Sequence, residues 1–372
     1  MTHFDQRTAV AELRAGQAAE RAANPTRLAP GWYFGTLCRS IAVARGDWLH
    51  CAAYAEGMGW SDVARVAKAA VDPINSTSLP AAMKPFNEDL AALLRPLTLI
   101  GRLGLRRVPL ATRLLRQSVG GDASFVAEGD PVAATAAGYD DAVELARLKV
   151  GGISVFSGEV MRSMSRGASA LIAADIASSI AEALDRAFID PSFSGVPNVA
   201  PASITSTGTR LQSSGTTLAA IDADIKALIA ALVAAGMPLT TATLVMSPIT
   251  ATNLSLLRGT GGAPAYPNIT ARAGSIAGLP VLTSAALSSA GSPGERQIAL
   301  VEAAEVMLGD DSEALVDVST NATMQMSDTP VDGAAQGVSL WQSNLIGVKT
   351  TRFCNWLPRR DGAVAVMENV LY

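Results

Sequence analysis

One amphipathic segment, running from Ser169 to Phe188, constrains the fold of this chain more than any other feature. Charged residues such as Asp175 and Glu182 lie between apolar ones, so an α-helix would place the two kinds on opposite faces. Proline cannot continue a helix, so Pro191 is expected to end it. The segment therefore predicts a long helix with one buried face. Its apolar stripe recurs at every fourth position and comprises Ile172, Ile176, Ile180, Leu184 and Phe188.

A second helix is predicted from Leu218 to Val233, where apolar residues again recur at helical spacing. Gly236 and Pro238 follow it and are typical of a helix end. After this helix, Leu244–Met246 is continuously apolar and is expected to form a short buried strand.

The last part of the chain is predicted to be rich in strands. Apolar and polar residues alternate from Val316 to Met326, which is typical of a half-buried strand. Residues 338–370 are apolar and strand-rich, with a turn at Arg360-Asp361-Gly362. Helices and strands follow one another in mixed order, without a regular strand–helix alternation. This order predicts an α+β fold.

The first 71 residues are predicted to form a helical extension. Trp32 to Ala70 holds most of the tryptophan and is expected to form two short helices, broken at Gly46 and at Gly57–Gly59. Large aromatic side chains signal packing, so we expect this extension to be kept in the mature protein.

Residues 81–150 are predicted to be extended, after a linker over residues 72–80. The prolines in this region argue against one long helix. Apolar positions roughly alternate between Val143 and Val155, with a break at Gly151-Gly152. We expect a pair of strands there, in the form of a hairpin arm. The prolines concerned are Pro85, Pro96 and Pro109.

Length and composition favour a large soluble protein of several structural units. The chain has 372 residues, of which 49% are hydrophobic, and one core usually stops growing near ~250–300 residues. A formal net charge of −4 excludes a polycation built to grip nucleic acid. Three cysteines without C-x-x-C spacing favour a reducing compartment. The charged N-terminus and the lack of a long apolar run predict neither a signal peptide nor a membrane span.

The residues that usually carry catalysis are scarce, and we predict no catalytic, cofactor-binding or metal site. Of the two histidines, His3 is near the N-terminus, and His50 lacks further metal ligands at short spacing. No common zinc-protease, hydrolase or phosphate-loop motif occurs, and Gly259–Gly262 is expected to be a plain loop. The paired acids Asp140-Asp141 and Asp310-Asp311 are expected to be solvated loop charges. Met324 and Met326 are expected to pack in a core.

Two adjacent blocks of opposite charge stand out. Six arginines and no acid occur from Arg95 to Arg116, and six acids and no base occur from Asp122 to Glu144. Both blocks lie in segments predicted to be extended, so each is expected to meet the other on a neighbouring chain. A rival interpretation is that the arginines neutralise the phosphates of DNA. The residues assigned to these contacts are Arg102, Arg106, Arg107, Arg113, Arg116, Glu128, Asp130, Asp140, Asp141 and Glu144.

The order of several short motifs over about residues 80–370 resembles the Hong Kong 97-like major capsid proteins of tailed bacteriophages. Each motif is weak alone, but together and in order they are fairly specific. The matching stretches are Ser124–Gly129 (SFVAEG), Ile153–Val160 (ISVFSGEV), Ala181–Phe188 within the long helix, Met246-Ser247-Pro248, Ala277–Val281 (AGLPV) and Leu345–Arg352.

The resemblance implies a shell subunit of a phage head. Such subunits form hexamers and pentamers that close an icosahedral shell around double-stranded DNA. Implied partners are further copies of the chain, a portal, cement proteins and packaged DNA bound without sequence preference, with no membrane. The protein would be made in the bacterial cytoplasm and end in the virion. The implied parts are a helical extension (1–71), an N-arm (72–117), an extended E-loop (118–152), a peripheral domain with a spine helix (153–215 and 331–372) and an axial domain (216–330).

The chain departs from the founding family member at the site of its covalent cross-link. That protein joins subunits through an E-loop lysine and an asparagine of the peripheral domain. Here the loop from 118 to 148 contains no lysine, and Val132 stands about where it would be. We therefore expect subunits held by noncovalent contacts alone.

Two other classes of function compete with this interpretation. An encapsulin nanocompartment shell shares the implied fold, and particles filled with cargo protein instead of DNA would favour it; the long N-terminal extension argues against it. A cytosolic enzyme of an unrecognised family would be a small oligomer with a ligand-filled pocket. The scarcity of histidine and the missing motifs argue against an enzyme.

Overall fold

The computed structural model describes residues 30–71, 78–119, 125–126, 138–159, 167–259, 261–288, 296–325, 337–360 and 362–372. The chain divides into two units, each assembled from three separate stretches. The first unit takes Met1–Leu97, Val150–Ala181 and Ser312–Arg352, and the second takes Thr98–Lys149, Glu182–Asp311 and Phe353–Tyr372. Expected structure in residues 1–29, including the surroundings of His3, lies outside the described residues.

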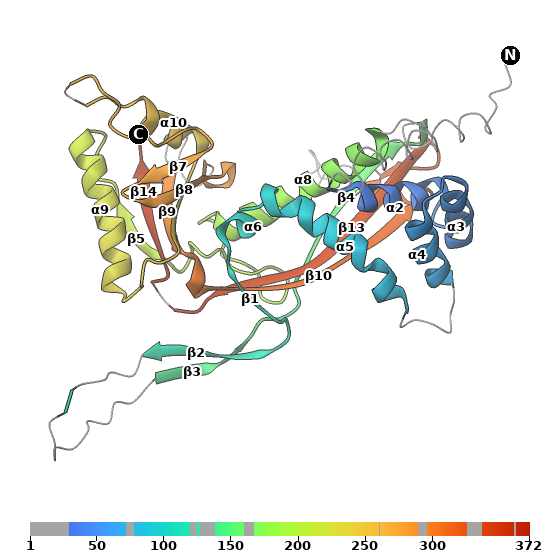
Figure 1. The fold of residues 1–372 in the computed structure, drawn as a ribbon, viewed down its shortest axis with the longest axis horizontal. Helices are drawn as coiled ribbons and strands as arrows, with labels where there is room; N and C mark the ends of the chain where they lie inside the picture. Colours follow the sequence, from blue (N-terminus) through green and yellow to red (C-terminus); the bar gives the residue numbers. More distant parts are fainter. Residues whose placement is uncertain are drawn as a thin grey trace. The chain divides into compact units, whose positions relative to one another are not determined.

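Four helices form the N-terminal part of the first unit (Figure 1). Their breaks fall where they were predicted, because Gly46 and Gly59 adopt the left-handed backbone that glycine tolerates. Two breaks separate three helices between Trp32 and Val71, where two were expected. A shared core that includes Leu37, Trp60 and Phe86 holds them together. The helices are α2 (Trp32–Val43), α3 (Trp48–Gly57), α4 (Ser61–Val71) and α5 (Ser78–Leu97).

The prediction that residues 81–97 are extended was wrong, because α5 runs through Pro85 and Pro96. A proline inside a helix costs about 3 kcal/mol. Tertiary packing offsets that cost: Phe86, Leu90 and Leu94 form a fully buried stripe at helical spacing. The carboxylate of Asp89 adds two hydrogen bonds, accepting from the backbone N–H groups of Gly31 (2.8 Å) and Phe34 (3.0 Å).

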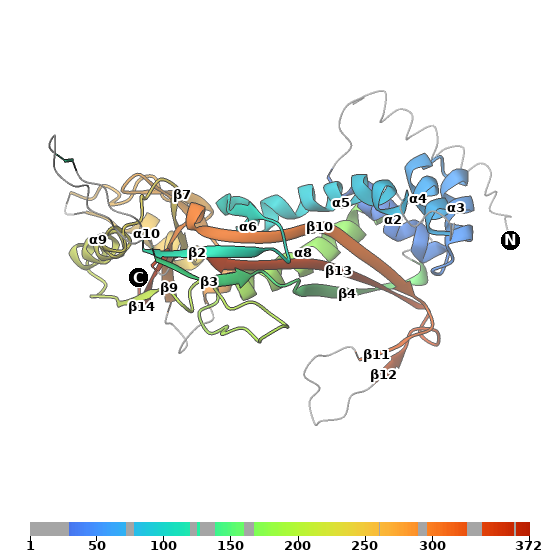
Figure 2. The same cartoon turned by 90° about the horizontal axis from the view of Figure 1, so that it is seen from below.

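The long amphipathic helix is confirmed as α8 (Gly167–Ile189). All five residues of the predicted stripe are buried. The chain also forms a four-stranded sheet in the order β1-β10-β13-β4 (Figure 2). Its strands are β1 (Arg106–Val108), β10 (Val306–Ser319), β13 (Leu345–Pro358) and β4 (Lys149–Ser157).

Three strand predictions need correction. Gly151 and Gly152 lie inside β4, and the break falls instead at residues 145–148, between β4 and β3 (Gly138–Glu144). These two strands do not pair with each other: β4 neighbours β13, and β3 pairs with β2 (Arg113–Val119). Asp310 and Asp311 belong to β10, and Asp140 and Asp141 to β3, so none of these acids lies in a loop.

The strand predicted from Val316 to Met326 is interrupted. β10 ends at Ser319, and a separate short strand, β11 (Thr323–Gln325), pairs with β12 (Gly337–Ser339). Met324 is half-buried in β11. Met326 lies outside the described residues.

A six-stranded sheet with two helices forms the centre of the second unit (Figure 1). The predicted helix at 218–233 and strand at 244–246 are confirmed as α9 (Leu218–Ala234) and β6 (Ala242–Met246). Thr217 and Ser247 cap α9 and α10 (Pro248–Leu256) with side-chain hydrogen bonds. The sheet order is β5 (Thr209–Gln212), β14 (Val364–Val370), β9 (Arg296–Glu302), β6, β8 (Leu279–Thr283) and β7 (Ala273–Ile276).

The C-terminal tail is shared between the units, whereas the expected division grouped 331–372 with 153–215. β14 pairs with β9 and β5, so its hydrogen bonds tie residues 364–370 to the six-stranded sheet. The turn predicted before β14 is confirmed, although Asp361 lies outside the described residues. Short 3₁₀ turns follow β8 and β9 at Ala285–Ser288 and Ala303–Glu305.

Candidate inter-subunit surface

Two strands, β2 and β3, form a two-stranded sheet of their own and carry part of both charge blocks. In their antiparallel register, Arg113 lies opposite Glu144 and Arg116 lies opposite Asp140. Directly opposite residues are neighbours on an antiparallel ladder, where opposite charges are favourable. Part of the charge complementarity is therefore available inside one hairpin, without a neighbouring chain.

Arg102 also interacts electrostatically with an acid of its own chain, Asp185. It lies on α6 (Leu99–Leu103), and its guanidinium donates to the carbonyl of Thr283 at 3.2 Å. Nearby on α8, Asp185 accepts the N–H of Leu99 at 2.8 Å. Burial raises the pKa of Asp185 to about 6, although the Leu99 hydrogen bond and the charge of Arg102 act in the opposite direction.

The remaining predicted contact residues are scattered over the second unit. Arg106 and Arg107 are exposed on β1, an edge strand of the four-stranded sheet. Glu144 is exposed at the end of β3, next to Asp140 and Asp141 on the same strand. Glu128 and Asp130 lie outside the described residues. The backbone register thus sets Arg113 and Arg116 opposite acids of their own chain, whereas Arg106 and Arg107 are exposed on an edge strand.

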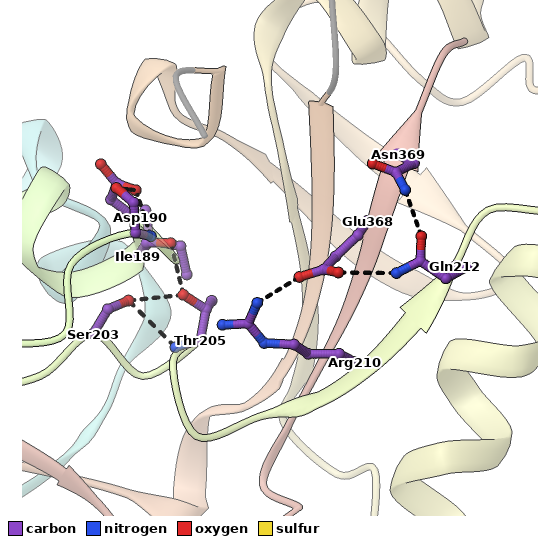
Figure 3. A network of polar contacts seen from close by, with 9 residues as sticks. Ile189, Asp190, Ser203, Thr205, Arg210, Gln212, Glu368 and Asn369 are labelled. Atoms are coloured by element: carbon purple, nitrogen blue, oxygen red, sulfur yellow. Dashed lines mark hydrogen bonds and ion pairs between the residues drawn. The ribbon is translucent and has the colours of Figure 1, made fainter. Parts of the chain in front are cut away.

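Sequence reasoning did not single out the segment after α8, which returns to cap that helix (Figure 3). A helix end leaves its last carbonyls without partners inside the helix. Here Ser203 Oγ donates to the carbonyl of Phe188 at 3.0 Å, and Thr205 Oγ1 donates to that of Ile189 at 3.0 Å. The two hydroxyls are also 2.7 Å apart. These bonds fix residues 190–205 against the end of the helix.

A second polar network in Figure 3 holds the edge strand β5 to β14. Glu368 accepts from Arg210 at 2.7 Å and from Gln212 at 2.9 Å, and Asn369 donates to Gln212 at 2.5 Å. These side chains reinforce the parallel pairing at one end of the six-stranded sheet. Their contacts are within one chain, so they serve the fold of the subunit.

Beside the capped segment lies a groove with a volume of about 280 Å³. Three parts of the chain form it: the connection between β3 and β4, the segment 196–207 and the end of β13. Trp356 anchors the floor, since its indole N–H donates to the carbonyl of Ala202 at 2.9 Å and its ring meets Phe188 edge-on at 5.3 Å. The wall is mostly apolar and includes Leu145, Leu148, Val196, Pro201 and Pro358.

Several large apolar side chains are exposed on the subunit. The Phe125 side chain is fully exposed, and Val196 and Val199 beside the groove are 52% and 62% exposed. In the first unit, Trp341 is 73% exposed. Large exposed aromatics mark surfaces that another molecule covers.

The described residues offer little that resembles an enzyme's chemistry. They contain no group of three potential metal ligands, and His50 contacts only Asp47, at 2.5 Å, on an exposed surface. Burial raises the pKa of the Cys38 and Cys51 thiols to about 12, so neither is a reactive thiolate near neutral pH. All three cysteines are buried, and none forms a disulfide. Within the described parts of the chain, no helix has the length and apolar character to cross a bilayer.

Comparison with known proteins decides the family. The model of the phage capsid family matches residues 105–369. The capsid polyprotein of Pseudomonas phage PAJU2 is 37% identical over 291 residues, which are 76% of this chain and 43% of that protein. The chain belongs to the phage capsid family. It spans less than half the length of this curated relative.

Solved structures support the same fold. A chain from Mycobacterium phage Bobi is 19% identical with a TM-score of 0.52, covering 73% of this chain and 89% of its own. One from Mycobacterium phage Ogopogo is 17% identical with a TM-score of 0.52, covering 73% and 92%. These structures show the fold, and the family match confirms the resemblance to Hong Kong 97-like major capsid proteins, which makes the chain a structural capsid component of the virion. The family match begins at Leu105, so α2–α5 lie outside it.

Proposed function

We propose that this capsid protein assembles as hexamers and pentamers into a closed icosahedral shell around double-stranded DNA. The observation that carries the proposal is the β2–β3 hairpin, whose strands pair only with each other among the described strands. An isolated two-stranded hairpin is marginally stable in water, so it gains stability by lying on another chain. A portal and cement proteins are proposed as further partners, and packaged DNA as a contact without sequence preference.

The proposed parts of the subunit follow the family plan. They are a helical extension at 1–71, an N-arm at 72–117, an E-loop at 118–152, a peripheral domain at 153–215 and 331–372, and an axial domain at 216–330. The hairpin lies within the N-arm and E-loop, which supports their role as tethers. The helix α5 within the N-arm range implies that only the later part of the arm is extended.

The charge blocks are proposed to strengthen the tether. In the register of the hairpin Arg113 and Arg116 stand opposite acids of their own chain, so the exposed Arg106 and Arg107 are proposed as partners for the acidic block of a neighbouring copy. Each exposed pair is worth only about 0.2–1 kcal/mol. A closed shell repeats the pair at every copy of the interface, so its total effect on assembly is large.

A charge reversal tests this proposal. The double variant Glu128→Arg with Asp130→Arg should fail to form shells, or form them only within a narrow range of salt, while circular dichroism shows a folded subunit. A matched control, Glu88→Arg with Asp175→Arg, makes the same charge change on exposed helix surfaces and should assemble normally. Assembly is measured by sedimentation and negative-stain microscopy. Normal empty shells from the first variant would exclude pairing between subunits, and a wild-type protein that forms only small oligomers would exclude the shell itself.

A further inference from the structure

The groove beside Trp356 has the chemistry of a receptor for one apolar side chain. Leu145, Leu148 and Trp356 are buried in its wall, while Val196, which is 52% exposed, adds apolar surface to its lining. Its volume of about 280 Å³ is just below the roughly 300–1,000 Å³ of pockets that hold drug-sized ligands. The size therefore fits a large side chain with a few neighbouring atoms better than a cofactor.

The groove is also rigid. Ser203 and Thr205 are bonded to the end of α8, and Trp356 is bonded to Ala202. Asn355 donates to the carbonyl of Ala146 at 2.8 Å, which fixes the opposite wall. Because both walls are held by hydrogen bonds to different elements, the groove is formed before anything binds, and binding has little ordering cost.

The side chain of Phe125 is left exposed to solvent by its own subunit. Phe125 is fully exposed and its neighbour Val126 is 38% exposed. Both belong to the segment between β2 and β3, the hairpin that pairs with no other described strand. An exposed phenylalanine and an apolar groove lie at different places on one chain, so a contact between them in two copies would be head-to-tail. Contacts of this kind close into rings when copies are related by rotation.

We propose that Phe125 of one subunit inserts into the groove beside Trp356 of the next subunit. The inference rests on the proposed shell assembly and names the surface that receives the hairpin. The occupant is a second copy of this chain.

The charges around the two halves agree with this pairing. Glu128 and Asp130 follow Phe125 by three and five residues. Arg147 and Arg360 lie within two residues of the groove lining and are paired with Asp311 and Glu305 respectively. An arginine has five N–H donors, so each of the two can also donate to a carboxylate of an incoming segment.

An engineered disulfide tests the contact in assembled shells. The variant Phe125→Cys with Val196→Cys places one thiol between the hairpin strands and one in the lining of the groove. Mild oxidation should give a ladder of covalent oligomers on a non-reducing gel, because each subunit carries both halves and links propagate from copy to copy. Reductant should collapse the ladder. Dissociated subunits at the same concentration should remain monomers, and each single-cysteine variant should give no ladder.

A matched control pairs Phe125→Cys with Val233→Cys, an exposed position on α9 that is 55% exposed. The proposal is overturned if closed shells of the groove variant give no ladder, or if the α9 variant gives an equal one. Dimers from Phe125→Cys alone would show that hairpins meet each other. In all these cases the closed shells seen by microscopy would leave the proposed function intact. Absence of particles from the wild-type protein would instead remove the proposed function.

A second set of variants covers the case in which the cysteine pair does not assemble. Phe125→Ala should lower the urea concentration at which shells dissociate, and Phe125→Trp should restore it, since an aromatic side chain again fills the groove. Val233→Ala should leave dissociation unchanged. Shells of Phe125→Ala that resist urea as well as the wild type would overturn the proposal.

Discussion

The carboxylate of Asp185 should make the subunit less stable at neutral pH than in mild acid. Asp185 lies on α8, accepts the N–H of Leu99 at 2.8 Å and faces the hydroxyl of Ser284 at 3.5 Å. Burial raises its pKa from 3.8 to about 6. At 1.36 kcal/mol per pKa unit, the ionised form costs the folded state up to about 3 kcal/mol.

The sign of the pH dependence follows from that pKa. The folded protein binds the proton more tightly than the unfolded chain, so the stabilisation is fully present below about pH 4 and is lost as the pH rises through about 6. Asp185→Asn removes the charge and keeps an oxygen for Leu99, while its amide can donate to Ser284. The variant should match the wild type near pH 4 and exceed it by about 1–3 kcal/mol at pH 7.5.

Urea unfolding of the full-length subunit at several pH values measures this difference as a shift in midpoint. Asp175→Asn is the matched control, since Asp175 is exposed on the same helix. Its difference from the wild type should not vary with pH. A variant at Asp185 that is destabilised equally at pH 4 and pH 7.5 would show that its hydrogen bonds, and not the cost of burying its charge, govern this site.

Two further outcomes concern the mature particle. A boiled, reduced gel of mature particles should show a single band near the monomer mass of 38.3 kDa, because no lysine occurs from residue 118 to residue 148, where the founding member carries its cross-linking lysine. Oligomers resistant to reduction would show another cross-linking chemistry. Intact mass of virion protein should reveal no species that begins near residue 72, because such a cut would divide the core that Phe86 shares with Leu37 and Trp60. A mature species starting there would contradict the packing argument.

The sequence predicted best those elements whose periodicity directly reports burial. In α8 the stripe from Ile172 to Phe188 faces the interior throughout, and in β6 every residue is buried. Both patterns depend only on which face of an element is covered. Local side-chain spacing is therefore sufficient to find them.

The sequence failed where tertiary contacts override a local preference. Pro85 and Pro96 indicated a broken chain, but α5 persists because Phe86 and Leu90 are buried against its neighbours. Gly151 indicated a turn, but a Cβ at this strand position would lie 3.3 Å from the carbonyl oxygen of Thr350. Glycine there permits a close approach to β13 and does not break the strand.

Only the charge blocks of the candidate surface could be predicted from the sequence; the hairpin register and the groove could not. Opposite charge blocks are apparent from composition, but the register that sets Arg113 opposite Glu144 depends on the hairpin. The groove has no local signal at all, because its lining comes from residues 144–148, 196–207 and 355–358. Only the folded chain brings these three segments together.

The register also changes the balance of forces expected at the subunit contact. Arg113 and Arg116 stand opposite acids in the register of their own hairpin, and each exposed pair contributes only about 0.2–1 kcal/mol. Burying one phenylalanine that was fully exposed contributes about 1.5–3 kcal/mol. Salt screens the exposed charge pairs but leaves the apolar contact in place. A single Phe125 contact therefore outweighs an exposed charge pair, and the shell should tolerate salt better than it tolerates loss of this one side chain.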